Sequence, residues 1–306
     1  DSSVTGVQTC ALPIWITGAG GLVGSYLVRT AERWAPGLKV RGLTRQDIDL
    51  TDESAVRRFW REDQPALVIH CAAISRPAVC EQDPGLARNV NVDATALLAS
   101  LAGDRPLLFF SSDQVFDGRQ GRYVETDAIN PINYYGETKA AAEEIVLSNS
   151  RHTVIRLALT AGTSLTGDRS FVEDMRRSAA REHRLTLFTD EFRSPVPAGV
   201  VARAIWELIA QKPSGLYHLG GAERLTRMEI GEALAMRYPE LASRLQPGSV
   251  ADYHGPPRPP DLSMRCDKLQ RLLSFPIPGF RSWVMNRTTA GTDEWDFPLI
   301  SSGLVV

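Results

Sequence analysis

Short apolar runs alternate with segments of helical period through the first half of the chain. The runs are apolar along their whole length, which is typical of strands covered on both faces of a sheet. They lie at 13–16, 39–43, 66–71, 107–111 and 153–157. The helical segments between them lie at 22–34, 53–62, 86–102 and 135–148. Strands that alternate with helices predict right-handed crossovers, so the expected fold class is α/β with a Rossmann-type doubly wound parallel sheet.

The second half of the chain has a mixed pattern. Residues 170–182 and 198–209 have a helical period, whereas 185–188 and 216–219 are expected to be extended. Thr226 and Glu229 have the spacing of a capping box, which predicts a helix that begins at Arg227. The segment 255–260 contains four prolines and is expected to be a stiff loop.

Composition and charge narrow the class of protein. The chain has 306 residues, 43% of them hydrophobic and 23% charged, and a net charge of −2. This balance gives no reason to expect nucleic acid or an anionic membrane as a partner, and no apolar run is long enough to span a bilayer. The four cysteines show no metal-ligand spacing, so we expect reduced thiols, no metal site and a cytoplasmic protein.

The two ends of the sequence are unusual. Residues 4–14 read VTGVQTCALPI, which resembles the in-frame translation of a sequencing-adapter oligonucleotide. We therefore set residues 1–14 apart as an artefact and expect the native part of the sequence to begin at about Trp15. Residues 285–306 show no clear period and are expected to form a tail.

A glycine-rich turn follows the first predicted strand. Gly18, Gly21 and Gly24 have the spacing Gly-x-x-Gly-x-x-Gly, and the predicted helix starts at Leu22 and Val23. Glycines permit the tight turn, the close approach of a pyrophosphate and the packing of helix on strand, while the helix start offers free N–H groups. The sequence therefore predicts a dinucleotide site formed by these five residues.

The end of the second predicted strand bears on the choice of dinucleotide. NAD binders usually carry an acidic residue there, but this chain has Arg45, which could pair with a 2′-phosphate. NADP(H) is therefore favoured over NAD(H). Asp49 and Leu50 are candidates to hold an adenine edge, although Asp49 could instead cap the following helix. Two small residues after the third strand would let a ribose lie against the backbone. They are Ala72 and Ala73.

Three residues have the spacing of a catalytic group. Tyr135 and Lys139 are four residues apart, so a helix places them on one face. A nearby ammonium is expected to lower the pKa of the phenol, which would give its proton to an alkoxide formed by hydride transfer. Ser112 lies 23 residues before Tyr135 at a strand end and would bind the same oxygen. By contrast, His70 is expected to be a packed, hydrogen-bonded residue.

Several strings then resemble the extended short-chain dehydrogenase/reductase superfamily, and within it the dTDP-4-dehydrorhamnose reductase family. The resemblance runs from about Ile14 to Val284. Its most specific part, 111–118, reads SSDQVFDG and is similar to the family string STDYVFDG. Further matches are NVDAT at 91–95, PINYYG at 131–136 and SPVPA at 194–198.

The resemblance implies reduction of a 4-keto nucleotide sugar, with Ser112, Asp113 and Gln114 beside the sugar. Gln114 stands where the family has a Tyr near the sugar, so the shape of the sugar pocket is expected to differ from that of the family. The implied domains are a dinucleotide-binding domain at 15–160, joined again by 195–212, and a smaller substrate-binding domain at 161–194 and 213–284. The family also implies a homodimer and, in some members, magnesium at the dimer contact.

Two other functions remain open from the sequence. An NAD-dependent epimerase or dehydratase of the same fold would favour an acid at Arg45, and a dehydratase needs two acids beside the catalytic hydroxyl, where this chain has only Asp113. A non-catalytic dinucleotide-binding regulatory subunit would keep the glycine turn without needing Ser112, Tyr135 or Lys139.

Overall fold

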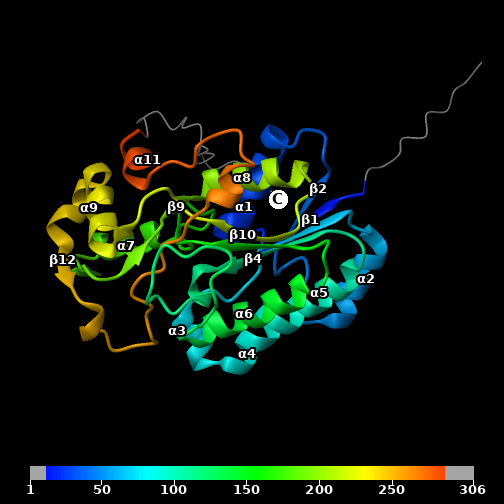
Figure 1. The fold of residues 1–306 in the computed structure, drawn as a ribbon, viewed down its shortest axis with the longest axis horizontal. Helices are drawn as coiled ribbons and strands as arrows, with labels where there is room; N and C mark the ends of the chain where they lie inside the picture. The colour runs from blue at the N-terminus through cyan, green and yellow to red at the C-terminus, as the bar shows by residue number, and fades with distance from the viewer. Residues whose placement is uncertain (1–11, 287–306) are drawn as a thin grey trace, which may run out of the picture.

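A parallel sheet of six strands forms the centre of the molecule (Figure 1). The computed structural model describes residues 12–286. The strand order is β10-β5-β4-β3-β1-β2, and every neighbouring pair is parallel. The strands are β1 (Ile14–Thr17), β2 (Val40–Leu43), β3 (Leu67–His70), β4 (Leu107–Ser112), β5 (Thr153–Leu157) and β10 (Gly215–Leu219). The doubly wound α/β class is therefore confirmed, and the strand order reverses between β1 and β3, where such sheets bind ligands.

Helices cover both faces of this sheet (Figure 1). One face packs against α1 (Leu22–Trp34) and α8 (Ala198–Ala210), with Ile16, Leu27 and Trp206 in its core. The other packs against α2 (Glu53–Asp63), α5 (Ala94–Ala102) and α6 (Tyr134–Leu147). Because successive strand residues point to opposite faces, Trp15 enters the second core while Ile14 and Ile16 enter the first.

The helical segment expected at 86–102 is confirmed, but it contains an irregular turn. The structure has α4 (Pro84–Arg88), a π-helical turn η1 (Asn89–Asp93) and then α5. The wider turn holds the buried Asn91. Its side-chain amide accepts a hydrogen bond from the N–H of Ile74, donates one to the carbonyl oxygen of Ile74 and donates another to the hydroxyl of Thr138. A side chain that ties together three segments is a physical reason for the irregular turn. Helix α3 (Pro77–Gln82), which precedes α4, was not predicted.

Most of the remaining elements are short, and α7, α9, β12 and α11 lie together at one end of the sheet, on the left in Figure 1. Helices α7 (Phe171–Ala180) and α9 (Arg227–Arg237) both begin with complete capping boxes, so the predicted start at Arg227 is confirmed. The short strands are β6 (Thr160–Ala161), β7 (Leu185–Phe188), β8 (Phe192–Arg193), β9 (Val196–Pro197), β11 (Leu225–Thr226) and β12 (Leu245–Gly248). The short helical elements are η2 (Asp113–Val115), η3 (Pro239–Arg244), η4 (Val250–Asp252), α10 (Asp267–Gln270) and α11 (Phe280–Asn286). Of these, only β7 was predicted from the sequence, because pieces of this length carry almost no periodic signal.

The predicted return of 195–212 to the main sheet agrees with the packing of α8 against α1, whereas the division into two domains stays a prediction. Ile14 belongs to β1, and residues 1–11 of the segment that we set apart lie outside the described residues. In the predicted tail, Met285 and Asn286 complete α11, and 287–306 also lie outside the described part.

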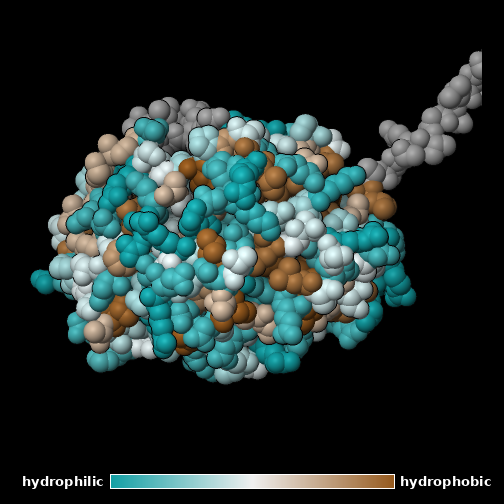
Figure 2. Space-filling model, in the orientation of Figure 1, coloured by the Kyte–Doolittle hydropathy of each residue, from teal (hydrophilic) through white to brown (hydrophobic). Residues whose placement is uncertain are grey.

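The surface in Figure 2 mixes hydrophilic residues with small, separate hydrophobic areas. None of the helices within residues 12–286 has both the length and the apolar character that crossing a bilayer requires.

Candidate active site

The glycine-rich turn connects β1 to α1 through contacts that exclude side chains. Gly18 has a φ of +67°, and a Cβ on it would lie 2.7 Å from the backbone nitrogen of Ala72. A Cβ on Gly24 would lie 2.3 Å from the carbonyl oxygen of Gly18. Gly21 is the N-cap of α1 and has no side chain to cover the helix start. The turn is therefore open to an anion, and this cradle fits a dinucleotide pyrophosphate.

Leu22 and Val23 contribute to this cradle only through their backbones. Their side chains pack into the core between α1 and the sheet. As the first residues of α1, they have N–H groups with no partner inside the helix.

The ends of β1 and β3 meet beside the cradle. His70 is fully buried, with Nδ1 2.6 Å from the hydroxyl of Thr17 and Nε2 3.0 Å from the hydroxyl of Thr95. Burial lowers the pKa of His70 to about 3, so the ring is neutral and structural, as the sequence predicted. Ala72 and Ala73 follow at the same edge and are half-buried.

The residues after β2 lie at the surface. The Arg45 guanidinium is 85% exposed and lies 3.7 Å from the carboxylate of Asp49. Asp49 accepts hydrogen bonds from the N–H and hydroxyl of Thr51, while Asp52 is the N-cap of α2. The alternative that Asp49 caps the following helix was therefore wrong. Leu50 packs against the core beneath α2.

Ser112, Tyr135 and Lys139 are brought together by β4 and the start of α6. All three are buried, and the Ser112 hydroxyl lies near enough to the Tyr135 phenol to affect its pKa. Gly136 allows this arrangement, because a Cβ there would lie 2.2 Å from the carbonyl oxygen of Gln114. The start of α6 thus rests directly on the loop that carries Ser112.

The electrostatics of this group correct one expectation. We expected Lys139 to lower the pKa of Tyr135, but burial raises the pKa of this phenol above its ordinary value, opposed by the Ser112 hydroxyl. Burial also lowers the pKa of Lys139 to about 7, and its Nζ lies 4.0 Å from the centre of the Phe109 ring. Desolvation is the largest effect on the pKa of both groups because both are enclosed.

Asp113 and Gln114 extend the group along the same loop. The Ser112 hydroxyl donates to Oδ1 of Asp113 at 3.1 Å, and the buried Oδ2 has no partner. Burial raises the pKa of Asp113 to about 6, against the attraction of Arg193. Gln114 accepts a bond from Asn133, the N-cap of α6, at 2.9 Å.

A cluster of buried charge beside Asp113 was missed by the sequence analysis. Glu191 is 1% exposed and binds Arg193 at 2.7 Å and Arg258 through two bonds of 2.8 and 2.9 Å. Arg227 adds a third guanidinium, whose pKa burial lowers to about 10 and whose nearest ring is Phe171 at 5.1 Å. The only feature of the sequence that could have indicated this cluster was Arg258, an arginine within the proline-rich loop. The cluster carries more positive than negative charge, so it could hold an anion.

No three His, Cys, Asp or Glu side chains within 12–286 are grouped to hold a metal. The magnesium that the resemblance implies at a dimer contact stays a prediction, and we derive no step through a metal.

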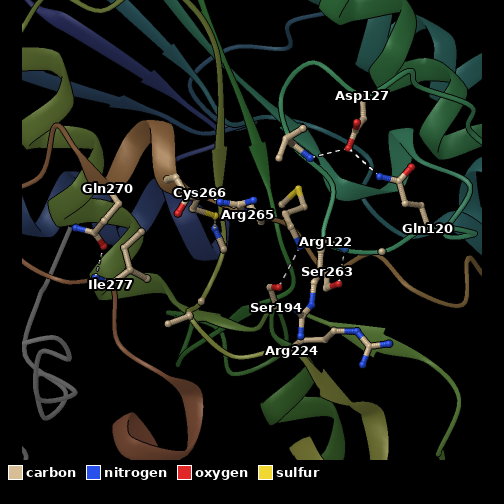
Figure 3. A pocket seen from close by; sticks show the side chains of 17 residues that line it. Gln120, Arg122, Asp127, Ser194, Arg224, Ser263, Arg265, Cys266, Gln270 and Ile277 are labelled. Atoms are coloured by element: carbon tan, nitrogen blue, oxygen red, sulfur yellow. Dashed lines mark hydrogen bonds and ion pairs between the residues drawn. The ribbon is translucent and has the colours of Figure 1, made fainter.

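A separate cavity of about 750 Å³ lies between the loop 120–127 and the segment 263–267 (Figure 3). Arg122, Arg224 and Arg265 line it together with Ser263 and Cys266, and Figure 3 shows them converging from different segments. None of the predicted site residues lines this cavity, so the candidate site rests on the cradle and the Ser112 group instead.

Comparisons with known proteins cover nearly the whole described chain. A family model described as RmlD substrate binding domain matches residues 12–290. The chain is 32% identical over 276 residues to methionine adenosyltransferase 2 subunit beta of Bos taurus, covering 85% of this chain and 82% of that protein. It is 32% identical over 260 residues to the probable low-salt glycan biosynthesis reductase Agl14 of Haloferax volcanii, covering 79% and 85%. The crystal structure of a dTDP-4-dehydrorhamnose reductase from Clostridium acetobutylicum superimposes with a TM-score of 0.81 at 25% identity, covering 89% and 96%.

The buried Asp113 predicts a pH-dependent cost to stability. Its pKa is raised in the folded protein, from 3.8 to about 6, so folding takes up a proton between these values and stability falls as pH rises through them. Asp113→Asn removes this penalty and should raise the free energy of unfolding at pH 7 by up to about 3 kcal/mol. Urea denaturation of both proteins at pH 3.5 and pH 7 measures this difference in the free energy of unfolding. An equal effect of the substitution at both pH values would contradict the raised pKa of Asp113.

Proposed function

The chain belongs to the RmlD substrate binding domain family, and we propose that it is an NADPH-dependent reductase of a 4-keto nucleotide sugar. The observation that carries this proposal is the enclosed group of Ser112, Tyr135 and Lys139 beside a cradle that only glycines can form. The reductase names of two of the proteins it resembles support the same reaction class.

The residues divide the chemistry among themselves. Bound NADPH would supply a hydride to the carbonyl carbon, which leaves negative charge on the oxygen. Tyr135 gives that oxygen its proton, and the raised pKa keeps the phenol protonated until then. Ser112 donates a hydrogen bond to the same oxygen and orients it. Lys139 would hold the ribose hydroxyls and replace the proton that Tyr135 loses.

The arginine cluster supports a nucleotide sugar as the substrate. Arg193 and Arg258 form ion pairs with Glu191, and Arg227 is attracted to the same carboxylate. The attraction between Arg193 and Asp113 connects the cluster to the Ser112 loop. A diphosphate would supply negative charge to balance the excess positive charge of the cluster. Guanidinium groups bind phosphate oxygens in pairs.

The alternative that the chain is a binding subunit has one specific observation in its favour. A relative at 32% identity is named as a subunit of methionine adenosyltransferase 2. The retention of all three catalytic residues favours the reductase, and a turnover assay separates the two functions.

We expect NADPH to be oxidised when the protein is mixed with dTDP-4-keto-6-deoxyhexose, as followed by absorbance of the reduced nicotinamide. Tyr135→Phe should lower kcat by at least about 100-fold, because the proton donor is lost, while NADPH affinity stays nearly unchanged. Full activity of this variant would remove Tyr135 from its role. Sugar rearrangement without oxidation would favour an epimerase, and cofactor binding without turnover would favour the subunit.

Arg45 is expected to select the cofactor. Its exposed guanidinium can form charge-assisted bonds with a 2′-phosphate, which contribute about 1.5–3 kcal/mol. Arg45→Asp should therefore raise KM for NADPH by about 10- to 100-fold and leave KM for NADH unchanged or lower. Steady-state kinetics with both cofactors measure this, and an equal change for both would show that Arg45 does not contact the 2′-position.

Arg227 is expected to act on substrate binding. Arg227→Gln removes a charge from the cluster and should raise KM for the nucleotide sugar by about 10- to 100-fold, with a smaller effect on kcat. Arg122→Gln, on the wall of the separate cavity, is the matched control and should leave KM unchanged. If the two variants behaved alike, the cluster would not be the anion site.

A further inference from the structure

A buried ion pair connects α6 to β5 behind the catalytic residues. Glu143 is 2% exposed and Arg156 is 4% exposed. Arg156 donates from Nε to both carboxylate oxygens, at 3.0 and 3.1 Å, and from Nη2 to Oε2 at 2.8 Å. Desolvation of two charges usually cancels much of their attraction, and apolar replacements of such pairs are often as stable. Stability alone therefore does not account for a carboxylate at this place.

The position of Glu143 along α6 connects it to the reaction. Tyr135, Lys139 and Glu143 follow one another at intervals of four residues, and all three are buried. Residues at this spacing share one helix face, with Cβ atoms roughly 5–6 Å apart. Lys139 thus lies between the phenol and a fixed carboxylate.

The other groups around Lys139 are uncharged at neutral pH. Burial keeps the His70 ring neutral, and it raises the pKa of the Cys71 and Cys80 thiols and of the Tyr135 phenol, which stay protonated. Phe109, on β4, presents its ring to the ammonium at 4.0 Å. The Arg156 guanidinium, on β5, lies on the Glu143 carboxylate and also approaches His218, on β10, at 3.5 Å. Burial lowers the pKa of Lys139, and Glu143 is the strongest charge that opposes this.

We propose that Glu143 is a positioning residue for Lys139, whose carboxylate, held in place by Arg156, keeps the buried ammonium protonated beside Tyr135. Arg156 has a part in this because its bidentate contact prevents the Glu143 carboxylate from turning away. The inference rests on the proposed role of Lys139 in the reductase, but the charge of Lys139 can be measured without any substrate.

The chain offers an unusually clear measurement, because it contains only four lysines, Lys39, Lys139, Lys212 and Lys268. In protein labelled with ¹³C at the lysine ε-carbon, one NMR signal should titrate near pH 7 and should be absent from Lys139→Arg. Glu143→Gln should move that titration at least about one pH unit lower, because the opposing charge is gone. The alkaline limit of reductase activity should move in the same direction.

Matched variants separate this role from a structural one. Glu144→Gln changes the exposed neighbour on the same helix and should leave the Lys139 titration in place. Glu143→Gln with Arg156→Gln removes both members of the ion pair, so neither is left buried without the other, and the double variant should recover stability while the shift persists. A lower melting temperature with an unchanged Lys139 titration, in the single or the double variant, would overturn the proposal. A shift in a protein that oxidises no NADPH would uphold it and refute the reductase.

Discussion

The candidate site depends on three places where backbone meets backbone at the carboxyl edge of the sheet. Gly18 lies against Ala72, Gly24 against Gly18, and Gly136 against the carbonyl oxygen of Gln114, and each would collide with a methyl group. The first two contacts bring α1 and β3 together around the cradle, and the third sets α6 on the Ser112 loop. Both halves of the site are therefore fixed by main chain, which holds positions more rigidly than side chains do.

A second property of the site is the amount of charge that it encloses. Lys139, Asp113, Glu191 and Arg193 are all removed from water, and burial moves the pKa of Lys139 and of Asp113 toward neutrality. Burial of such groups lowers the stability of the fold. The apolar layers on both sides of the sheet offset this loss. Groups that titrate near pH 7 are suited to proton transfer, so the cost and the proposed function have the same origin.

The relatives of this chain include both a protein named as an enzyme and a protein named as a subunit. One protein with 32% identity is named as a reductase and another, equally similar, as a subunit of a different enzyme. The shared fold agrees with either role, because a dinucleotide cradle needs only the glycine turn and the β1–β3 edge. The enclosed side chains of Tyr135, Ser112 and Lys139 are not needed for the cradle, and they are the feature that favours a catalytic function.

The sequence by itself determined the sheet class, the position of α1, the shared helix of Tyr135 and Lys139 and the start of α9, since each depends on local spacing or turn chemistry. It also predicted His70 as a packed residue. Only the tertiary structure decided the π-helical turn at Asn91, the raised pKa of Tyr135 and the cluster of Glu191 with Arg193, Arg227 and Arg258. These features arise from contacts between residues up to 67 positions apart and from exclusion of water, and neither leaves a periodic trace in the chain.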